Sequence, residues 1–182
     1  MKQKFVLGIS GASGVLLGLE FLRALPNDLD IYLIMTESAY KVADKEHSIA
    51  LELRTNITLL DVRDISASVA SGSFGVDKMA IIPTSMNTLA KIACGISDCL
   101  LTRVASVMIK ERKTLLLAPR EMPFSGIALE NMLKLSNYGV IISPPILGYY
   151  AKTETLEDMQ KFLIGKWLDS LKIPNQIYQR WK

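Results

Sequence analysis

The sequence predicts an α/β protein with a single doubly wound, mostly parallel sheet and helices on both of its faces. Short aliphatic runs alternate along the chain with longer amphipathic segments, which is the order that β-α-β units produce. The aliphatic runs are apolar at successive positions, as expected for strands that helices cover on both faces. Hydrophobic residues make up 49% of the 182 residues, so a chain of this length can form a substantial core.

The first half of the chain alternates between expected strands and helices. Residues 5–9 form a short apolar run, and residues 14–24 carry apolar side chains at helical spacing before Pro26 ends the helix. Residues 31–35 are the second expected strand, and residues 38–45 are the helix that follows it. This order predicts a first β-α-β unit, with the carboxyl ends of both strands at one edge of the sheet.

The second half continues the alternation. Expected strands lie at residues 78–82, 114–118 and 140–142, and expected helices lie at residues 88–93, 98–112, 125–136 and 155–171. Gly95 separates the first two of these helices, and Pro144 ends the last strand. No repeat or linker divides the chain, so we expect one domain over residues 1–182, with the last helix and polar tail in oligomer contacts.

The composition argues against several kinds of site. The two cysteines, Cys94 and Cys99, and the single histidine, His47, are too few for a zinc site, and nothing points to a Ser-His-Asp triad. The 21 basic and 18 acidic residues are too balanced to indicate nucleic acid. We therefore expect no metal site and no nucleic-acid partner.

The distribution of apolar residues bears on where the protein works. No stretch of about 18 consecutive apolar residues is present, so we expect no membrane span. The apolar start of the chain lacks a signal-peptide cleavage pattern, and Gly11 and Ser13 interrupt it where a turn would lie. We expect a cytoplasmic protein whose excess apolar surface is buried between the subunits of a homo-oligomer.

The loop between the first strand and the first helix has the sequence Gly8-Ile-Ser-Gly-Ala-Ser-Gly14. Small residues let a ligand approach the backbone, and a helix N-terminus offers free N–H groups and the positive end of its dipole. A phosphate site and a plain tight turn both explain this loop. It does not match the dinucleotide pattern G-x-G-x-x-G, although Glu37 after the second strand leaves a dinucleotide open.

A second loop of this kind, Pro83-Thr-Ser-Met-Asn-Thr88, follows the third expected strand and opens another helix. Ligands of doubly wound sheets bind at the carboxyl ends of the strands, so two such loops at one edge favour a mononucleotide. Thr36 ends the second strand at the same edge, where its hydroxyl can contact the ligand or cap the next helix.

Charged residues follow the fourth expected strand. Arg120 and Glu121 come after Pro119, at the edge where ligands bind. An arginine can make a forked contact with a phosphate, although a solvated Arg–Glu pair would look the same in sequence. Arg103 and Lys110 are seven residues apart on one expected helix and would share a face, which solvent exposure also explains.

Several motifs together resemble the UbiX-type flavin prenyltransferases, and the resemblance runs from about Phe5 to Trp181. The linked set is specific, whereas the first glycine loop alone would be a weak signal. In chain order the motifs are Gly8-Ile-Ser-Gly-Ala-Ser-Gly14, Ser71-Gly-Ser-Phe74, Pro83-Thr-Ser-Met-Asn-Thr-Leu89, Leu101-Thr-Arg-Val-Ala105, Ile109-Lys-Glu-Arg112, Pro119-Arg-Glu-Met-Pro-Phe-Ser125, Leu129-Glu-Asn-Met-Leu133 and Pro144-Pro145 through Tyr150.

The resemblance implies a Rossmann-like flavoprotein fold and a metal-independent transferase. Members of the family bind reduced FMN as a substrate together with dimethylallyl monophosphate. They join the prenyl group to N5 and C6 of the flavin and release phosphate. The prenylated FMN then serves UbiD-type decarboxylases, as in ubiquinone biosynthesis. The family assembles into trimer-based dodecamers with sites at the subunit junctions.

The resemblance also implies which residues form the site. The implied FMN-binding residues are Gly11, Ala12, Ser13, Thr36, Ser85, Met86, Asn87, Thr88 and Arg120. The implied prenyl-phosphate-binding residues are Arg103, Lys110, Arg120, Tyr150 and Lys166, and the implied catalytic residues are Ser13, Glu46 and Glu121. Three features depart from the family, one of which is Ala128 in place of a common histidine before Leu129-Glu-Asn. Lys166 replaces a usual arginine, which keeps the charge but loses the fork, and His47-Ser48 replaces the acidic neighbour of Glu46.

Two other functions stay open. An FMN-dependent decarboxylase of a cysteine-derived carboxylate shares the first loop and the Pro83–Asn87 region, but it needs a catalytic histidine for which His47 is the only candidate. A non-catalytic FMN-binding subunit would bind flavin and leave the prenyl phosphate untouched. The Ile109–Arg112 and Pro119–Ser125 motifs favour the prenyltransferase.

Overall fold

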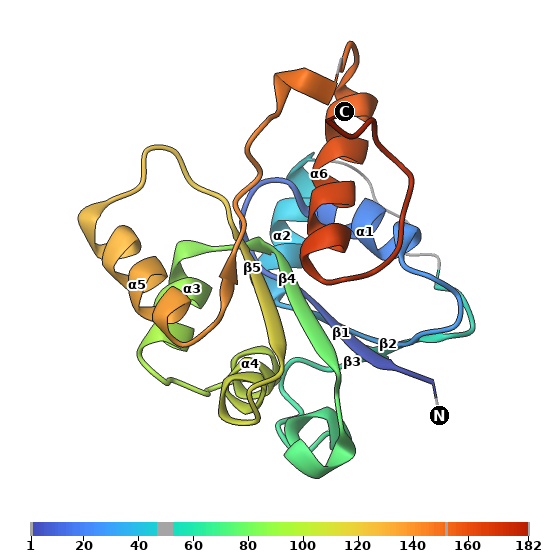
Figure 1. The fold of residues 1–182 in the computed structure, drawn as a ribbon. Helices are drawn as coiled ribbons and strands as arrows, with labels where there is room; N and C mark the ends of the chain where they lie inside the picture. The colour runs from blue at the N-terminus through green and yellow to red at the C-terminus, as the bar shows by residue number, and fades with distance from the viewer. Residues whose placement is uncertain (1, 47–52, 152, 182) are drawn as a thin grey trace.

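The computed structural model describes residues 2–46, 53–151 and 153–181. Within them, a six-stranded parallel sheet has the strand order β3-β2-β1-β4-β5-β6 (Figure 1). The strands are β1 (Lys4–Ile9), β2 (Asp30–Met35), β3 (Ile57–Leu60), β4 (Lys78–Thr84), β5 (Thr114–Pro119) and β6 (Ile141–Ile142). The doubly wound parallel sheet predicted from the sequence is confirmed.

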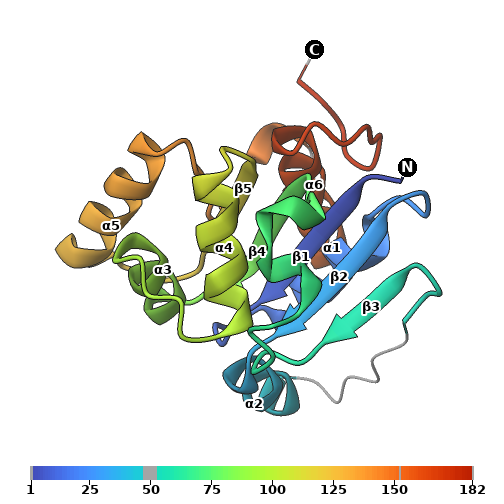
Figure 2. The same cartoon turned by 90° about the horizontal axis from the view of Figure 1, so that it is seen from below.

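The sequence pattern misses β3, which lies at the edge of the sheet beside β2 (Figure 2). Thr58 and Leu59 of β3 are exposed, and Ile57 and Leu60 are only partly buried. An edge strand has one neighbour and meets solvent, so it does not need the continuous apolar run that marks a covered strand. The expectation of five strands is therefore wrong by one, and the missing strand brings residues 61–63 to the site edge of the sheet.

Within the described residues, six α-helices cover the sheet, and each of them begins close to its expected residue. They are α1 (Val15–Ala24), α2 (Glu37–Glu46), α3 (Met86–Ala93), α4 (Leu100–Lys110), α5 (Gly126–Asn137) and α6 (Leu156–Ser170). Side-chain hydroxyls of Ser85, Ser125 and Thr155 accept backbone N–H groups and so begin α3, α5 and α6. None of the described helices is long and apolar enough to cross a membrane.

Two hydrophobic layers hold the helices on the sheet. Side chains from α1, α2 and α6 pack on one face, around Phe5, Phe21 and Trp167. Side chains from α3, α4 and α5 pack on the other face, together with the short 3-10 turn at Ser68–Ala70 (Figure 1). Since β2 and β4 flank β1 on opposite sides, the chain direction across the sheet reverses at β1, where the loops after β1 and β4 meet.

Candidate functional site

A buried serine joins the two loops at the switch point. The Ser10 side chain donates a hydrogen bond to the Pro83 carbonyl at 3.0 Å and accepts one from the Ser85 backbone N–H at 2.8 Å. The Ser10 backbone N–H also donates to the Pro83 carbonyl, at 3.2 Å. Ser10 is fully buried, so these bonds form away from water and hold the two loops in one arrangement.

A cavity of about 830 Å³ opens beside these loops. Helices α2, α3 and α4 all begin at it, so their N-termini turn free N–H groups and positive dipole ends toward one place. Such an arrangement favours an anion with several oxygen atoms, such as a phosphate. The polar residues that line the cavity are Thr36, Glu37, Ser38, Arg63, Ser85, Asn87, Thr88, Lys91, Asp98, Cys99 and Thr102.

Gly11 lets the first loop lie against α2. A Cβ atom at position 11 would lie 2.4 Å from the Cβ of Ser38 and 3.0 Å from the backbone carbonyl carbon of Ser38. Any residue larger than glycine at position 11 would therefore force the loop or α2 to shift. Thr36 caps α2, because its hydroxyl accepts the Ala39 N–H at 3.1 Å, and it also lies 3.1 Å from the Ser38 hydroxyl. Thr36 therefore fulfils the capping role while it lines the cavity.

Two ion pairs at the cavity are absent from the expected site. The Arg63 Nε donates to Glu37 at 2.9 Å, and Lys91 lies 2.6 Å from Asp98. The hydrogen bond between the two side chains raises the pKa of Lys91 and lowers the pKa of Asp98. Arg63 follows the unpredicted strand β3, so no sequence signal could place it here. Lys91 and Asp98, flanking Gly95, carry only the signal of a helix end.

The implied catalytic residues Ser13 and Glu46 lie together at a second cavity of about 480 Å³. Glu46 ends α2, and its two carboxylate oxygens accept the Gly14 backbone N–H at 3.0 and 3.1 Å. The carboxylate thus sits at the N-terminus of α1, where the helix dipole favours negative charge. His47, the departure from the family beside Glu46, lies outside the described residues.

Arg120 and Glu121 line a third cavity of about 360 Å³ with Pro119, Pro144 and Ile146. The Arg120 backbone N–H donates to the Thr84 carbonyl at 3.1 Å, so Arg120 starts where β4 and β5 both end. The Glu121 carboxylate accepts the Met122 N–H at 3.0 Å and is otherwise exposed. Their position at the carboxyl edge is as expected, and both side chains are accessible to a ligand.

The remaining expected residues lie outside these three cavities. Arg103 is exposed in the first turn of α4, next to Thr102, which lines the first and largest of these three cavities. Lys110 ends α4 near the start of β5, at the opposite edge of the sheet, where it pairs with Glu111. Tyr150 and Lys166 lie on the C-terminal part of the chain, in a 3-10 turn and on α6. One chain therefore brings several of the residues expected to bind FMN to one cavity, whereas the residues expected to bind the prenyl phosphate lie apart.

The chain as a whole matches known flavoproteins. The profile of the Flavoprotein family matches residues 1–168. The flavin prenyltransferase UbiX of Helicobacter pylori strain J99 is 52% identical over 183 residues, which cover 98% of each chain. The span that matches the family profile includes both loops and the Arg120–Glu121 pair described above.

Solved structures show the same fold over the full length. AnUbiX, in complex with FMN and dimethylallyl pyrophosphate, superposes with a TM-score of 0.94 at 34% identity, over 100% of this chain and 98% of that one. The dodecameric FMN-dependent UbiX-like decarboxylase of Escherichia coli O157:H7 gives a TM-score of 0.93 at 36% identity, over 99% and 100%. Identity and coverage at this level establish the relationship, and the chain belongs to the UbiX flavin prenyltransferase family of flavoproteins.

Proposed function

We propose that the protein transfers a dimethylallyl group from dimethylallyl monophosphate to N5 and C6 of reduced FMN. The prenylated FMN is then passed to a UbiD-type decarboxylase. The observation that carries this proposal is the position of two polar regions at one edge of the sheet. The helix N-termini around the largest cavity suit the FMN phosphate, and the Arg120–Glu121 rim suits a second phosphate and its protons.

The residues around the cavity fit FMN in size and chemistry. Gly11 lets the first loop lie directly against Ser38, and the hydroxyls of Thr36, Ser38 and Ser85 can bond phosphate oxygens. Arg63 and Lys91 also line this cavity, and each is paired with a carboxylate there, so the two ion pairs add polar groups but no net charge. Ala12, Met86, Asn87 and Thr88 belong to the same two loops and complete the proposed FMN-binding set.

The prenyl side needs groups that act on a leaving phosphate. When the allylic C–O bond breaks, its electron pair leaves with the phosphate, so the developing negative charge should face fixed cations. Arg120 lies at the carboxyl ends of β4 and β5, and Lys166, Lys110, Arg103 and Tyr150 complete the proposed set. Glu121, exposed beside Arg120, is the proposed residue for moving protons during phosphate release and ring closure. Ser13 and the carboxylate of Glu46, which both lie at the N-terminus of α1, would orient the reacting flavin edge.

The decisive experiment incubates the pure protein anaerobically with reduced FMN and either dimethylallyl monophosphate or dimethylallyl pyrophosphate. The mass of the extracted flavin should increase by one five-carbon prenyl unit, with the monophosphate as the better donor. Unchanged FMN with both donors, under conditions in which FMN is bound, would exclude the activity. Decarboxylation of a cysteinyl substrate by oxidised FMN would support the competing decarboxylase.

We further propose that the protein is a homo-oligomer, as the dodecameric Escherichia coli relative is, with active sites shared between subunits. The outer face of α5 supports this, because Ile127 is 73% and Leu133 64% exposed. Apolar patches of this kind on an otherwise folded chain mark contact surfaces. Sharing would bring Lys110, Tyr150 and Lys166 to a neighbour's flavin, which a single chain does not do.

Mixing two inactive variants tests this sharing. Glu121→Gln and Lys166→Ala proteins, each shown to be folded and impaired, are mixed under conditions that exchange subunits. Some subunit junctions in the mixture then carry both wild-type residues, Glu121 from one subunit and Lys166 from the other, so part of the activity should return. Exchange proven by mass spectrometry without any recovery of activity would contradict shared sites, as would a fully active monomer in light scattering.

A further inference from the structure

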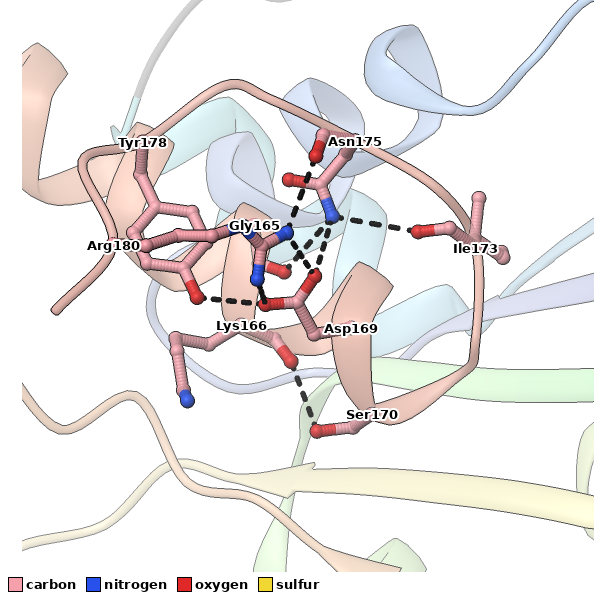
Figure 3. A network of polar contacts seen from close by, with 8 residues as sticks. All are labelled: Gly165, Lys166, Asp169, Ser170, Ile173, Asn175, Tyr178 and Arg180. Atoms are coloured by element: carbon pink, nitrogen blue, oxygen red, sulfur yellow. Dashed lines mark hydrogen bonds and ion pairs between the residues drawn. The ribbon is translucent and has the colours of Figure 1, made fainter. Parts of the chain in front are cut away.

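The end of the chain folds back onto α6 through one carboxylate. Asp169, in the last turn of α6, accepts hydrogen bonds from Tyr178 Oη at 2.6 Å and from Asn175 Nδ2 at 2.8 Å (Figure 3). Arg180 makes a forked contact, with Nη1 2.8 Å from Oδ2 and Nη2 2.7 Å from Oδ1 of Asp169. Asp169, Asn175, Tyr178 and Arg180 are called the Asp169 clamp below.

The clamp is a charged contact that is partly shielded from water. The side chain of Asp169 is 25% exposed, whereas that of Arg180 is 50% exposed. Burial raises the pKa of Asp169, but the hydrogen bonds from the three tail residues outweigh burial and leave its pKa below the usual value. Asp169 is therefore ionised at neutral pH, and a forked Arg–carboxylate contact of this geometry is stronger than a single exposed ion pair.

Clamping brings the Tyr178 ring against α6 at Gly165. A Cβ atom at position 165 would lie 2.2 Å from the Tyr178 ring, so the contact requires glycine there. The Gly165 carbonyl also accepts a hydrogen bond from Asn175 Nδ2 at 3.4 Å. Lys166 is the next residue, and its side chain points away from Asp169 (Figure 3). The clamp thus fixes the helix backbone directly before Lys166.

Clamping also holds Tyr150 between the helix and the tail. The Tyr178 ring packs edge-on against the Phe162 ring of α6, and the Phe162 ring packs edge-on against Tyr150. In each pair the ring centroids are 5.5 Å apart. Trp181, one residue after Arg180, packs edge-on against the other side of Tyr150 at 5.4 Å. These aromatic contacts have the geometry that favours ring pairs. Tyr150 therefore touches the tail directly and also through Phe162.

We propose that the Asp169 clamp is a positioning device that sets Tyr150 and Lys166, the two C-terminal residues expected to bind the prenyl phosphate. This inference rests on the proposed function and goes beyond it, because it assigns roles to residues outside the expected substrate-binding set. Two residues from separate segments must meet one phosphate, and a misplacement of about 1 Å far from the reacting atoms can cost about 100-fold in rate. The clamp ties both segments to the same tail.

The clamp is tested with full-length variants in which its bonds are removed one at a time. Arg180→Ala removes the fork, Arg180→Lys keeps the charge without the fork, and Tyr178→Phe removes only the Oη bond while its ring stays against Gly165. Lys161→Ala is the matched control, because it removes an exposed ion pair with Glu157 on the same helix. For each variant, the KM for dimethylallyl monophosphate, kcat and the Kd for FMN are measured.

Arg180→Ala should raise the KM for the prenyl phosphate about 10-fold, less than a displacement of a full 1 Å would cost, and leave the Kd for FMN within about twofold. Arg180→Lys should recover part of this loss, Tyr178→Phe should show a smaller rise in KM, and Lys161→Ala should match the wild type. A wild-type KM in folded Arg180→Ala would overturn the proposal. Equal losses in prenyl-phosphate KM and FMN affinity would also overturn it, because they would show a general structural role.

Two further results separate this proposal from the proposed function. If Arg180→Ala does not fold, the KM and Kd values of Tyr178→Phe test the proposal instead, since that variant keeps every ring contact. A wild-type KM in Tyr178→Phe would then overturn it. If the wild type transfers no prenyl group, the proposed function fails by itself, and calorimetric binding of dimethylallyl monophosphate to the FMN-loaded variants still tests the clamp. Binding that is equal in wild type and Arg180→Ala, or absent from both, would overturn the positioning role.

Discussion

The flavin side and the prenyl-phosphate side of the candidate site are built in different ways. On the flavin side, buried hydroxyls join the strand ends: Ser10 bonds both loops, and Thr84 bonds the Ile81 carbonyl and the Ala118 N–H. On the other side, Arg120, Glu121 and Lys166 are exposed, and Lys166 depends on a tail held at the surface. Changes on the flavin side should therefore alter folding and FMN binding together. Changes at Glu121 and Lys166 on the other side should alter prenyl transfer alone, whereas Arg120 belongs to both proposed sets.

The largest effect is expected for Glu121→Gln. A neutral amide cannot exchange protons with the leaving phosphate or the flavin, so kcat should fall about 100-fold or more, as for the loss of a general acid or base. The Kd for FMN should stay within about twofold, because Glu121 lies outside the largest cavity. Single-turnover kinetics with saturating substrates measures the first effect, and flavin titration measures the second. Wild-type turnover in the variant would remove Glu121 from the mechanism.

The next largest effect is expected for Gly11→Ala on the flavin side. The added Cβ would meet Ser38 at 2.4 Å, and relieving this overlap should cost about 1–3 kcal/mol in FMN binding or in folding. We expect the Kd for FMN to rise roughly 10-fold or more. Gly126→Ala is the control, because a Cβ there meets no atom within 4 Å. Equal FMN affinity in the two variants would show that the first loop does not form the flavin site.

A third prediction concerns the bonds of Ser10. In Ser10→Ala, the Ser85 N–H loses the buried Ser10 hydroxyl as its hydrogen-bond acceptor. This loss should lower the free energy of unfolding by about 1–3 kcal/mol. FMN affinity should fall as well, since the two loops are no longer joined. Urea unfolding measures stability, and Ser66→Ala, at an exposed turn, should stay within about 0.5 kcal/mol of wild type. Lowered stability with unchanged FMN binding would contradict the expectation that changes on the flavin side alter folding and FMN binding together.

The smallest effect is a pH dependence of the clamp. Burial, the hydrogen bond to Asp169 and its charge raise the pKa of Tyr178 from 10.0 to about 12. The folded state favours the neutral phenol, so this contribution to stability is fully present below pH 10.0 and is lost as pH rises through about 12. Tyr178→Phe lacks the ionisable group, so its stability difference from wild type should shrink over that interval. Denaturant titrations at several pH values check this, and a constant difference would contradict it.

The sequence predicts most of the fold because covered strands and capped helices leave local signals. The four longest strands are apolar runs, and serine or threonine marks the start of α3, α5 and α6. The edge strand β3 carries no such run, and its omission also hides Arg63 at the largest cavity. The loops after β1 and β4 are recognisable because their small residues and hydroxyls suit a phosphate.

By itself, then, the sequence determined the fold class, the family and the two glycine- and hydroxyl-rich loops of the flavin side, since these follow from periodicity, capping and local motifs. Only the tertiary structure decided the strand order, the Ser10 bonds between the loops and the meeting of three helix N-termini at one cavity. It also decided the separation of Lys110 from the flavin side and the attachment of the tail to Asp169. These features depend on contacts between residues far apart in the chain, and no local pattern of side chains specifies which distant partner a residue meets.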